Sequence, residues 1–327
     1  MNNQPYAITA SHPGDTSVLK QVDIDPSTPS ATEVMIRQTA VGVNFIDTYF
    51  RSGLYPWPQE SDLILGCEGA GVIEAIGADV SGFSVGDRVA YTVVNGSYTS
   101  HRTVEERHLV HIPDSVSDQE AAAVMLKGLT AYYLLHDSYP VKAGETVLFH
   151  AAAGGVGLLA GQWLKSKGVR TIGTAGGAQK CALAKANGFD EVIDYKSEDF
   201  VARVMELTQG EGVSVVYDSI GKDTIMGSIE CLKRFGSLVS FGQSSGMADQ
   251  FRISDLASGS LNVCRPILFH FTEQRSWLDN ASRQLFDSIG EGILKVHIGA
   301  TWPLNQVNDA HQTLESRGTK GSTILIP

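Results

Sequence analysis

Apolar and polar positions divide the 327-residue chain into regions with different periodicity. Residues 1 to about 125 contain short runs in which apolar and polar residues alternate between Gly/Pro turns, as in "EVMIRQTAVGV" and "GDRVAYTVV". This alternation predicts β-strands. From about residue 126 to 267, apolar runs are separated by stretches with helical spacing, a pattern typical of parallel βαβ units.

In that central region the predicted strands are "TVLFHA", "RTIGTA", "EVIDY", "GVSVVYDSI" and "GSLVSFG". The predicted helices between them cover 155–167, 179–187, 197–208 and 223–234. Near the C-terminus, Val307, Ala310 and Leu314 share one helical face between a candidate N-cap at Asn305 and a candidate stop at Gly318. "STILIP" then predicts a final strand.

These patterns predict an α/β protein with two domains. A doubly wound parallel-sheet domain, 126–267, is inserted into a mainly β domain formed by 1–125 and 268–327. Hydrophobic residues make up 43% of the chain and charged residues 19%, so each domain has enough apolar residues for a core. No run approaches the roughly 18 consecutive apolar residues of a membrane span, and the first residues lack the basic and apolar regions of a signal peptide.

The formal net charge is −11, which argues against a nucleic-acid or anionic-membrane partner. Cys67, Cys181, Cys231 and Cys264 lie far apart in the sequence, and no two form a C-x-x-C pair. Without an export signal, this usage indicates reduced thiols in a cytoplasmic protein.

Small residues stand between the first central strand and its helix, in the sequence Ala152-Ala153-Gly154-Gly155-Val156-Gly157. This fits [G/A]-x-G-x-x-G, in which the first small residue permits a tight turn, the second lets the backbone approach a pyrophosphate, and the third lets the helix pack on the strand. The helix N-terminus adds N–H donors and a partial positive charge. The strand–turn–helix context favours a dinucleotide site. The alternative is a close helix–sheet contact without a ligand.

The end of the second central strand bears on which dinucleotide binds. An NAD site normally has Asp or Glu there, to bind the ribose 2′-hydroxyl. This chain has "TIGTAGGAQK", in which Thr174, Ala175 and Gly176 leave room and Lys180 is within reach of a 2′-phosphate. We therefore predict NADPH as the cofactor. The alternative for Lys180 is a solvated lysine on a helix face.

Longer motifs carry a family resemblance. "GCEGAGVIEAIGADVSGFSVGDRV" (66–89) resembles the G-x-E-x-x-G-x-V…G…V-x-x-F-x-x-G-D-R-V signature of medium-chain dehydrogenases/reductases, and "AAAGGVG" resembles their cofactor turn. Within that superfamily the chain is similar to the zinc-independent quinone oxidoreductases, the ζ-crystallin relatives. The resemblance extends to the final "ESRGTKGSTILIP". It implies a GroES-like β domain, a Rossmann domain, an active site in the cleft between them, and homodimers.

Zinc ligands are the main departure from the wider superfamily. Zinc alcohol dehydrogenases have Cys where this chain has Asn44, and His where it has Cys67. A catalytic zinc needs three protein ligands and an open fourth position. His108 and His111 are three apart, which in a strand places them on opposite faces. We therefore predict no zinc.

Without a Lewis acid, nothing would stabilise the alkoxide that develops in alcohol oxidation. A quinone is already an electrophile, and hydride addition gives a delocalised anion. The sequence therefore predicts NADPH-dependent reduction of a small quinone. Two alternatives stay open: reduction of an alkenal, enone or enoyl thioester on the same fold, and a crystallin-like structural protein that binds NADPH.

The resemblance implies roles for further residues. Asn44, Asp47 and Lys127 are expected at the catalytic site, and Tyr49 and Tyr55 in the quinone pocket. Ordinary capping, packing or solvation is the alternative for each. The expected cofactor contacts also include Thr130, Ala153, Tyr195, Ser219, Phe241, Gly242, Gln243, Leu268, Phe269 and Arg317.

Overall fold

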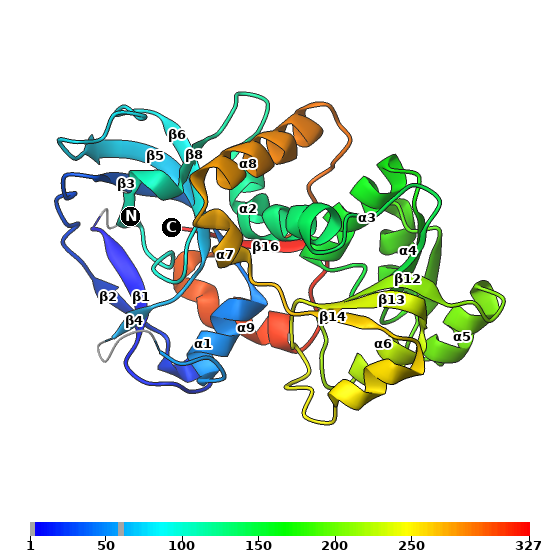
Figure 1. Ribbon diagram of the computed structural model, residues 1–327. Coiled ribbons are helices and arrows are strands. Elements are labelled where there is room, and N and C mark those ends of the chain that lie inside the picture. The colour runs from blue at the N-terminus through cyan, green and yellow to red at the C-terminus, as the bar shows by residue number, and fades with distance from the viewer. Residues whose placement is uncertain (1–3, 58–61) are drawn as a thin grey trace. The chain divides into compact units, whose positions relative to one another are not determined.

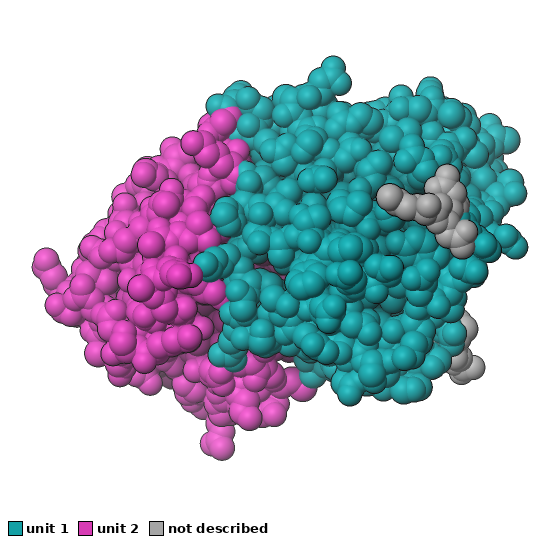
Figure 2. Space-filling model, turned by 180° about the vertical axis from the view of Figure 1, so that it is seen from behind, with its two compact units in different colours: residues 1–129, 269–291, 296–327 teal, residues 130–268, 292–295 magenta. Residues whose placement is uncertain are grey.

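The computed structural model describes residues 4–57 and 62–327. Contacts divide the chain into two compact units, which Figure 2 shows in two colours. Unit 1 contains described residues within 1–129, 269–291 and 296–327, and unit 2 contains 130–268 and 292–295.

The β-strands of unit 1 form two sheets in the described part of the chain (Figure 1). The first is antiparallel, in the order β2-β1-β4, and its strands are β1 (Tyr6–Ala10), β2 (Lys20–Asp23) and β4 (Leu63–Ile64). The second has the order β15-β16-β3-β5-β6-β8, with β7 also paired to β3. Its strands are β3 (Glu33–Val43), β5 (Glu68–Ile76), β6 (Arg88–Thr92), β7 (His101–Glu105), β8 (Leu109–His111), β15 (Ile298–Pro303) and β16 (Ser322–Ile326).

The C-terminal segment completes this second sheet, because β16 pairs antiparallel with β3 through Thr323↔Val43 and Leu325↔Val41. The helices whose residues lie wholly or partly in unit 1 are α1 (Phe45–Ser52), α2 (Asp118–Tyr133), α7 (Leu268–Thr272), α8 (Arg275–Gly290) and α9 (Val307–Glu315). One core of this unit joins the two ends of the chain, since Leu19, Phe50 and Leu65 pack in the same cluster as Val307 and Leu314.

Unit 2 is built on a parallel sheet in the order β11-β10-β9-β12-β13-β14. Its strands are β9 (Thr146–Phe149), β10 (Arg170–Ala175), β11 (Glu191–Asp194), β12 (Val213–Asp218), β13 (Leu232–Ser240) and β14 (Asn262–Cys264). Its helices are α3 (Gly155–Ser166), α4 (Ala178–Ala186), α5 (Phe200–Leu207) and α6 (Ile225–Glu230). This is the doubly wound Rossmann order, so the predicted fold class is confirmed.

Buried β-branched and aliphatic residues explain why these segments form central strands. Val213 to Asp218 are buried throughout β12, as are Val147 and Leu148 in β9. Strands covered on both faces read as continuous apolar runs rather than as alternation. Because all of these strands run parallel, their carboxyl ends lie at one edge of the sheet, where open α/β sheets bind ligands.

The predicted helix over 223–234 is too long at its C-terminal end. Helix α6 ends at Glu230 and strand β13 begins at Leu232, four residues before the predicted strand. Pairing between Val213 and Leu232, and a hydrogen bond from the Val213 N–H to the Cys231 carbonyl (2.8 Å), draw this segment into the sheet. Its own residues, Lys233 and Arg234 among them, carry no apolar strand pattern.

The caps predicted for the C-terminal helix are also wrong. A 3-10 turn over Leu304–Gln306 precedes α9, so Gln306 rather than Asn305 is the N-cap. At the other end the left-handed residue is Arg317, with φ of 58°, and the Gly318 N–H donates to the Thr313 carbonyl at 3.1 Å. These bonds close the helix in the manner of a Schellman motif, with arginine in the position usually given to glycine.

No helix within residues 4–57 and 62–327 has both the length and the apolar character needed to cross a bilayer. Two histidines considered as a metal pair lie in different local structures. His108 ends a 3-10 turn, Glu106–His108, whereas His111 ends β8.

Candidate functional site

The glycine-rich turn of unit 2 connects β9, which ends at Phe149, to α3, which begins at Gly155. Gly154 is the N-cap of this 12-residue helix and no side chain caps it. The first N–H groups of a helix have no partner within the helix and carry the positive end of its dipole. The predicted turn therefore presents unpaired donors at the ligand-binding edge of the sheet.

Close backbone packing explains the small residues of this turn. A Cβ atom added to Gly157 would lie 2.5 Å from the Ala151 carbonyl oxygen and 2.7 Å from that of Ala152. Ala151 itself has φ of 53°, a left-handed conformation that residues with a side chain adopt rarely. The Ala152 N–H donates to the Thr174 carbonyl at 2.9 Å, which ties the turn to β10. Little space remains between α3 and the turn beneath it.

Thr174 lies under this edge rather than at its surface. Its side chain is buried, and its hydroxyl lies 2.9 Å from His150 Nδ1. Ala175 is also buried, whereas Gly176 is partly exposed at the start of the loop. Of the three predicted residues Thr174, Ala175 and Gly176, only Gly176 is therefore partly exposed to solvent.

The loop after β10 meets the end of β11. The Gly177 N–H donates to Asp194 Oδ1 at 2.8 Å, and a Cβ atom on Gly176 would lie 2.5 Å from the Tyr195 hydroxyl. Tyr195 and Gly176 are therefore neighbours, although Tyr195 follows β11 and is 41% exposed. Lys180 lies in the first turn of α4, after the N-cap Gly177.

Two further predicted contacts lie at the ends of β12 and β13. A Cβ atom on Gly242 would lie 2.7 Å from the Ser219 carbonyl oxygen, so these two loops touch. The Phe241 N–H donates to the Asp218 carbonyl at 2.8 Å, and Gln243 follows in the same partly buried loop. The structure thus places Ser219, Phe241, Gly242 and Gln243 together.

A buried polar network that the sequence reasoning missed supports these strand ends. His150 Nε2 lies 3.0 Å from the Ser228 hydroxyl, which donates to Asp218 Oδ2 at 2.8 Å. Asp218 also accepts the Ile220 and Gly221 N–H groups at 2.8 and 3.0 Å. Burial lowers the pKa of His150, and the nearby Asp218 carboxylate opposes that effect. A neutral imidazole therefore links β9, β10 and α6 beneath the turn.

In unit 1 the predicted Lys127 forms a buried ion pair with Glu68, which the sequence reasoning noted only as part of a motif. Lys127 Nζ lies 2.5 Å from Glu68 Oε1, and the two residues are 6% and 0% exposed. Asn44 Nδ2 donates to the same oxygen at 2.9 Å, while the Leu126 N–H donates to Glu68 Oε2 at 2.6 Å. The predicted Asn44 and Lys127 therefore share one carboxylate.

The predicted Asp47 is fully buried beside this group. Its Oδ2 accepts the Asn44 backbone N–H and the Tyr98 hydroxyl, both at 2.8 Å. Burial raises the pKa of Asp47 to about 6, although the hydrogen bonds and the positive charge of Lys127 act in the opposite direction. Burial and the adjacent Asp47 also raise the pKa of the Cys67 thiol well above its ordinary value.

The two predicted pocket tyrosines form an aromatic pair. The ring centroids of Tyr49 and Tyr55 are 5.3 Å apart, and the Tyr55 ring also meets Phe50 at 5.6 Å. Tyr49 is buried on α1, only two residues after Asp47. This helix therefore carries both polar and aromatic candidates.

The remaining candidates are placed separately. Thr130 is buried on α2, Leu268 is buried and Phe269 partly buried at the start of α7, and Arg317 follows α9. The catalytic candidates of unit 1 and the strand-end candidates of unit 2 each form a group within their own unit. The sequence analysis missed the buried polar residues His150, Asp218, Ser228 and Glu68. Of these, only Glu68 lies in a recognisable local motif, between "GC" and "GAG".

The side chains of this site do not fit a zinc ion. Asn44 donates its amide N–H to Glu68, and the ammonium of Lys127 occupies the same carboxylate. Among the described residues, no cluster of three or more His, Cys, Asp or Glu is arranged to bind a metal.

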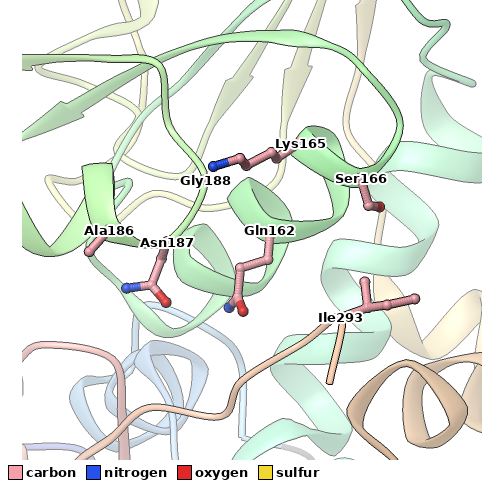
Figure 3. A pocket seen from close by; sticks show the side chains of 7 residues that line it. All are labelled: Gln162, Lys165, Ser166, Ala186, Asn187, Gly188 and Ile293. Carbon is pink, nitrogen blue, oxygen red and sulfur yellow. The ribbon is translucent and has the colours of Figure 1, made fainter. Parts of the chain in front are cut away.

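Unit 2 also has a surface pocket of about 290 Å³, lined by Gln162, Lys165, Asn187 and Ile293 among others (Figure 3). Lys165 lies near the C-terminal end of α3, and twelve residues of helix extend about 18 Å. The pocket is thus at the opposite end of α3 from the glycine-rich turn. We do not assign it to the dinucleotide site.

Comparisons with known proteins agree with this arrangement. Residues 30–114 match the family described as alcohol dehydrogenase GroES-like domain, and residues 155–283 match the family described as zinc-binding dehydrogenase. Quinone oxidoreductase of Pseudomonas aeruginosa is 46% identical over 316 residues, which cover 96% of this chain and 97% of that protein. 2-Haloacrylate reductase of a Burkholderia species is 40% identical, over 96% of both chains.

Among solved structures, Escherichia coli quinone oxidoreductase complexed with NADPH superposes with a TM-score of 0.96. It is 44% identical, and the match covers 98% of this chain and all of that one. The similarity spans both units, since it covers 98% of this chain. The chain therefore belongs to the quinone oxidoreductase family of the medium-chain dehydrogenase/reductase superfamily.

Proposed function

We propose that the chain uses NADPH to reduce a small quinone. In this proposal residues 126–267 form the NADPH-binding domain, and 1–125 with 268–327 form the GroES-like catalytic domain. The acceptor class rests on 46% identity to a quinone oxidoreductase over 96% of the chain. The cofactor class rests on the uncapped N-terminus of α3 directly after β9.

The residues of unit 2 fit a dinucleotide phosphate. Gly154 has no side chain to obstruct the backbone, and the N–H groups at the start of α3 suit a pyrophosphate. Lys180, in the first turn of α4, is the cation proposed for the 2′-phosphate. NADPH supplies a hydride when bound. The remaining proposed contacts are Lys127, Thr130, Ala153, Gly155, Val156, Gly157, Thr174, Ala175, Gly176, Tyr195, Ser219, Phe241, Gly242, Gln243, Leu268, Phe269 and Arg317, together with Asn44.

The polar group of unit 1 fits the acceptor side of the reaction. A quinone that accepts a hydride becomes an oxyanion and must then take up a proton. Lys127 carries a buried ammonium whose position is fixed by Glu68, so its charge offsets that of a developing oxyanion. Asn44 is held by the same carboxylate. Tyr49 and Tyr55 are proposed to supply an aromatic wall for a flat ring.

The test is NADPH oxidation by the purified, chelator-treated protein, followed by absorbance. We would compare a simple para-quinone, an alkenal and an alcohol with NADP⁺, with NADH as the control cofactor. Quinone reduction that survives chelation supports the proposal. Chelator-sensitive alcohol oxidation would contradict both the acceptor and our interpretation of Asn44 and Cys67.

A second candidate function is reduction of an activated alkene. The 40% identity to a 2-haloacrylate reductase over 96% of the chain specifically favours it. The same fold and cofactor would serve, and only the acceptor would differ. Activity with an alkenal or a haloacrylate but not with quinones would replace the first proposal by this one. Tight NADPH binding without any turnover would instead favour the structural, crystallin-like alternative.

Replacing Lys180 by glutamate should raise the KM for NADPH by about tenfold to 100-fold and leave that for NADH nearly unchanged. A charge-assisted hydrogen bond to a phosphate contributes about 1.5–3 kcal/mol, and only NADPH has the 2′-phosphate. Steady-state kinetics with both cofactors check this. Lys185→Glu is the matched control, because Lys185 lies at the opposite end of α4. Equal effects on both cofactors would remove Lys180 from this role.

We also propose a homodimer joined through the edge of the unit 2 sheet. Strand β14 is the last in the sheet order and its three residues are exposed. Such an edge offers unpaired backbone groups to a second strand. Apolar side chains beside it reach the surface, with Val263 43% and Phe235 74% exposed, and the Asn262 side chain donates to the Phe235 carbonyl at 3.4 Å.

Sedimentation velocity should then give about twice the chain mass of 35.1 kDa, and Val263→Lys should reduce it to that of one chain. Val85→Lys alters an exposed valine of unit 1, 61% exposed, and should leave the dimer intact. A monomeric wild-type protein would refute the dimer.

A cytoplasmic location is the last part of the proposal. All four cysteines are free thiols, including the exposed Cys264 and the partly buried Cys181. Proteins of oxidising compartments seldom keep several unpaired thiols. Fractionation of the source cells, with immunodetection of the chain, would test it.

A further inference from the structure

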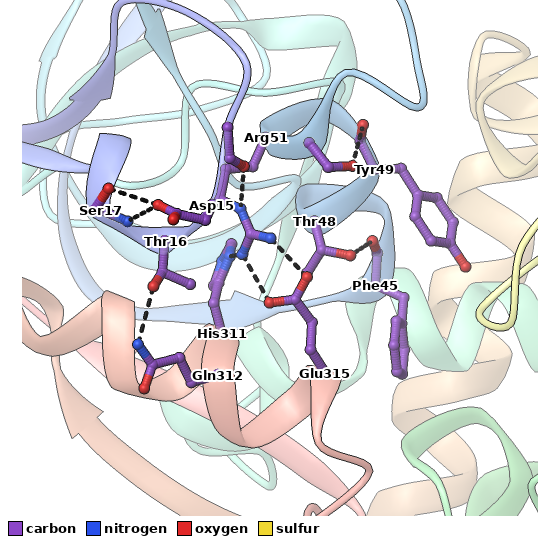
Figure 4. A network of polar contacts seen from close by, with 12 residues as sticks. Asp15, Thr16, Ser17, Phe45, Thr48, Tyr49, Arg51, His311, Gln312 and Glu315 are labelled. Atoms are coloured by element: carbon purple, nitrogen blue, oxygen red, sulfur yellow. Dashed lines mark hydrogen bonds and ion pairs between the residues drawn. The ribbon is translucent and has the colours of Figure 1, made fainter.

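A continuous chain of hydrogen bonds in unit 1 connects α9 to the group around Asn44. Arg51 donates to both carboxylate oxygens of Glu315, at 2.6 and 3.0 Å, and its Nη1 lies 3.1 Å from His311 Nδ1 (Figure 4). His311 Nε2 lies 2.8 Å from the Tyr98 hydroxyl, which lies 2.8 Å from Asp47 Oδ2. Of these residues, only Asp47 is among the side chains that the sequence predicts at the catalytic site.

The chemistry of the groups fixes the direction of these bonds. A guanidinium can only donate, so His311 Nδ1 accepts and the imidazole proton is on Nε2. That N–H donates to the Tyr98 oxygen, and the Tyr98 hydroxyl donates to the Asp47 carboxylate. Burial and the Arg51 charge lower the pKa of His311 to about 3, which agrees with a neutral ring. Each donor therefore points toward Asp47.

Asp47 in turn determines the position of Asn44. Its Oδ2 accepts the Asn44 backbone N–H at 2.8 Å, at the point where α1 begins. The Asn44 side chain then donates to Glu68 Oε1, the oxygen that also accepts the Lys127 ammonium. Three hydrogen bonds, by way of Asn44 and Glu68, thus connect Asp47 to the proposed catalytic cation.

We propose that Tyr98 and His311 are positioning residues for hydride transfer: they hold Asp47 as a carboxylate, which orients Asn44 and, through Glu68, Lys127. The inference rests on the proposed function. The competing view is that this series of hydrogen bonds only joins α9 to α1. The Arg51–Glu315 pair, whose glutamate is 39% exposed, is sufficient for that purpose. Tyr98 and His311 are fully buried and extend the chain inward to Asp47.

This proposal makes the reaction depend on the ionisation of Asp47. Burial raises the pKa of Asp47 to about 6, whereas the Tyr98 hydroxyl, the Asn44 N–H, the Cys67 thiol and the Lys127 ammonium lower it. Asp47 is therefore a carboxylate above about pH 6 and takes up a proton below it. Activity should fall on the acid side of that value.

Nearby groups other than Asp47 are less able to produce this fall in activity at acid pH, the acid limb of the pH–activity profile. Glu68 is paired with Lys127, Arg51 is paired with Glu315, and the low pKa of His311 leaves its ring neutral. Burial raises the pKa of Tyr98 and of Cys67 well above their ordinary values, so both stay protonated. Removing the Tyr98 hydroxyl takes away a donor that favours the charged form of Asp47. The limb should then move to higher pH.

The experiment measures kcat and KM for a para-quinone from pH 5 to 9, with the thermal midpoint recorded for each variant. Tyr98→Phe should move the acid limb up by about one to two pH units, the shift that corresponds to one lost charge-assisted hydrogen bond. His311→Leu should move it in the same direction. In His311→Gln the amide can still accept from Arg51 and donate to Tyr98, so the limb should return toward its wild-type position.

Gln312→Leu is the matched control. Gln312 also connects α9 to an N-terminal residue, through a 3.0 Å hydrogen bond to the Thr16 hydroxyl, but its side chain is not hydrogen-bonded to Arg51, His311, Tyr98 or Asp47. If Tyr98→Phe lowers only the thermal midpoint, as expected for Gln312→Leu, the positioning role is refuted. Should His311→Leu fail to fold, Tyr98→Phe against Gln312→Leu still decides. A wild-type enzyme that reduces no quinone refutes the proposed function instead.

Discussion

Replacing Glu68 by alanine is expected to lower the free energy of unfolding by about 3–5 kcal/mol, the cost of leaving a buried charge without its partner. Glu68 is completely buried and accepts N–H groups from Asn44, Leu126 and Lys127. Once the carboxylate is removed, the buried Lys127 ammonium loses its ion-pair partner and keeps only the electrostatic interaction with Asp47. Urea unfolding at pH 7, followed by circular dichroism, measures the change.

A surface pair provides the control for this substitution. Glu74 forms a 2.7 Å ion pair with Arg37, but the two side chains are 43% and 48% exposed. Water screens such a pair, so Glu74→Ala should cost at most about 1 kcal/mol. If Glu68→Ala lowered the free energy of unfolding by less than about 1 kcal/mol, Lys127 would have to be hydrated or neutral in the variant at little cost. That result would contradict the buried ion pair.

A double substitution separates stability from catalysis at the same site. Glu68→Leu with Lys127→Met removes both charges and fills similar volumes, and such replacements are often neutral or stabilising. We therefore expect the double variant to regain most of the stability lost in Glu68→Ala. Its quinone reductase activity should stay low, because the cation proposed to offset the acceptor charge is gone. Full activity would exclude Lys127 from the reaction.

The parallel-sheet domain was predictable because its determinants are local. Apolar runs such as "TVLFHA" and "GVSVVYDSI" identify buried strands, and the small residues of "AAAGGVG" identify the turn without knowledge of the rest of the chain. The prediction failed where pairing overrides local pattern. Lys233 and Arg234 belong to β13 because Val213 pairs with Leu232, and that contact is invisible in the segment itself.

The candidate site was predictable only in part, for a related reason. Asn44 and Asp47 were found through a family motif and lie within one turn of each other. Their partners come from distant segments, since Tyr98 is 51 positions from Asp47 and His311 is 213 from Tyr98. A tyrosine and a histidine in such segments read as ordinary packing residues. Only folding reveals that they form one hydrogen-bonded chain.

Gly157→Ala is expected to weaken NADPH binding by at least about 100-fold and to destabilise unit 2 by about 1–3 kcal/mol. The new Cβ would lie 2.5 Å from the Ala151 carbonyl oxygen and 2.7 Å from that of Ala152. Both obstacles are backbone atoms in a turn that already has a left-handed alanine, so α3 must move away from β9. The helix N-terminus proposed to bind the pyrophosphate would move with it.

Gly161→Ala distinguishes a displaced N-terminus from a general loss of packing. Gly161 lies one turn further along α3, where a Cβ would be 2.5 Å from the Phe189 ring and 2.7 Å from the Asn187 carbonyl oxygen. A Cβ atom at Gly161 is as crowded as one at Gly157, but the atoms that it meets do not belong to the glycine-rich turn. Calorimetric titration with NADPH and urea unfolding of both variants should show comparable losses of stability and a large loss of affinity for Gly157→Ala alone. Equal losses of affinity would mean that the whole helix, rather than its first turn, determines binding.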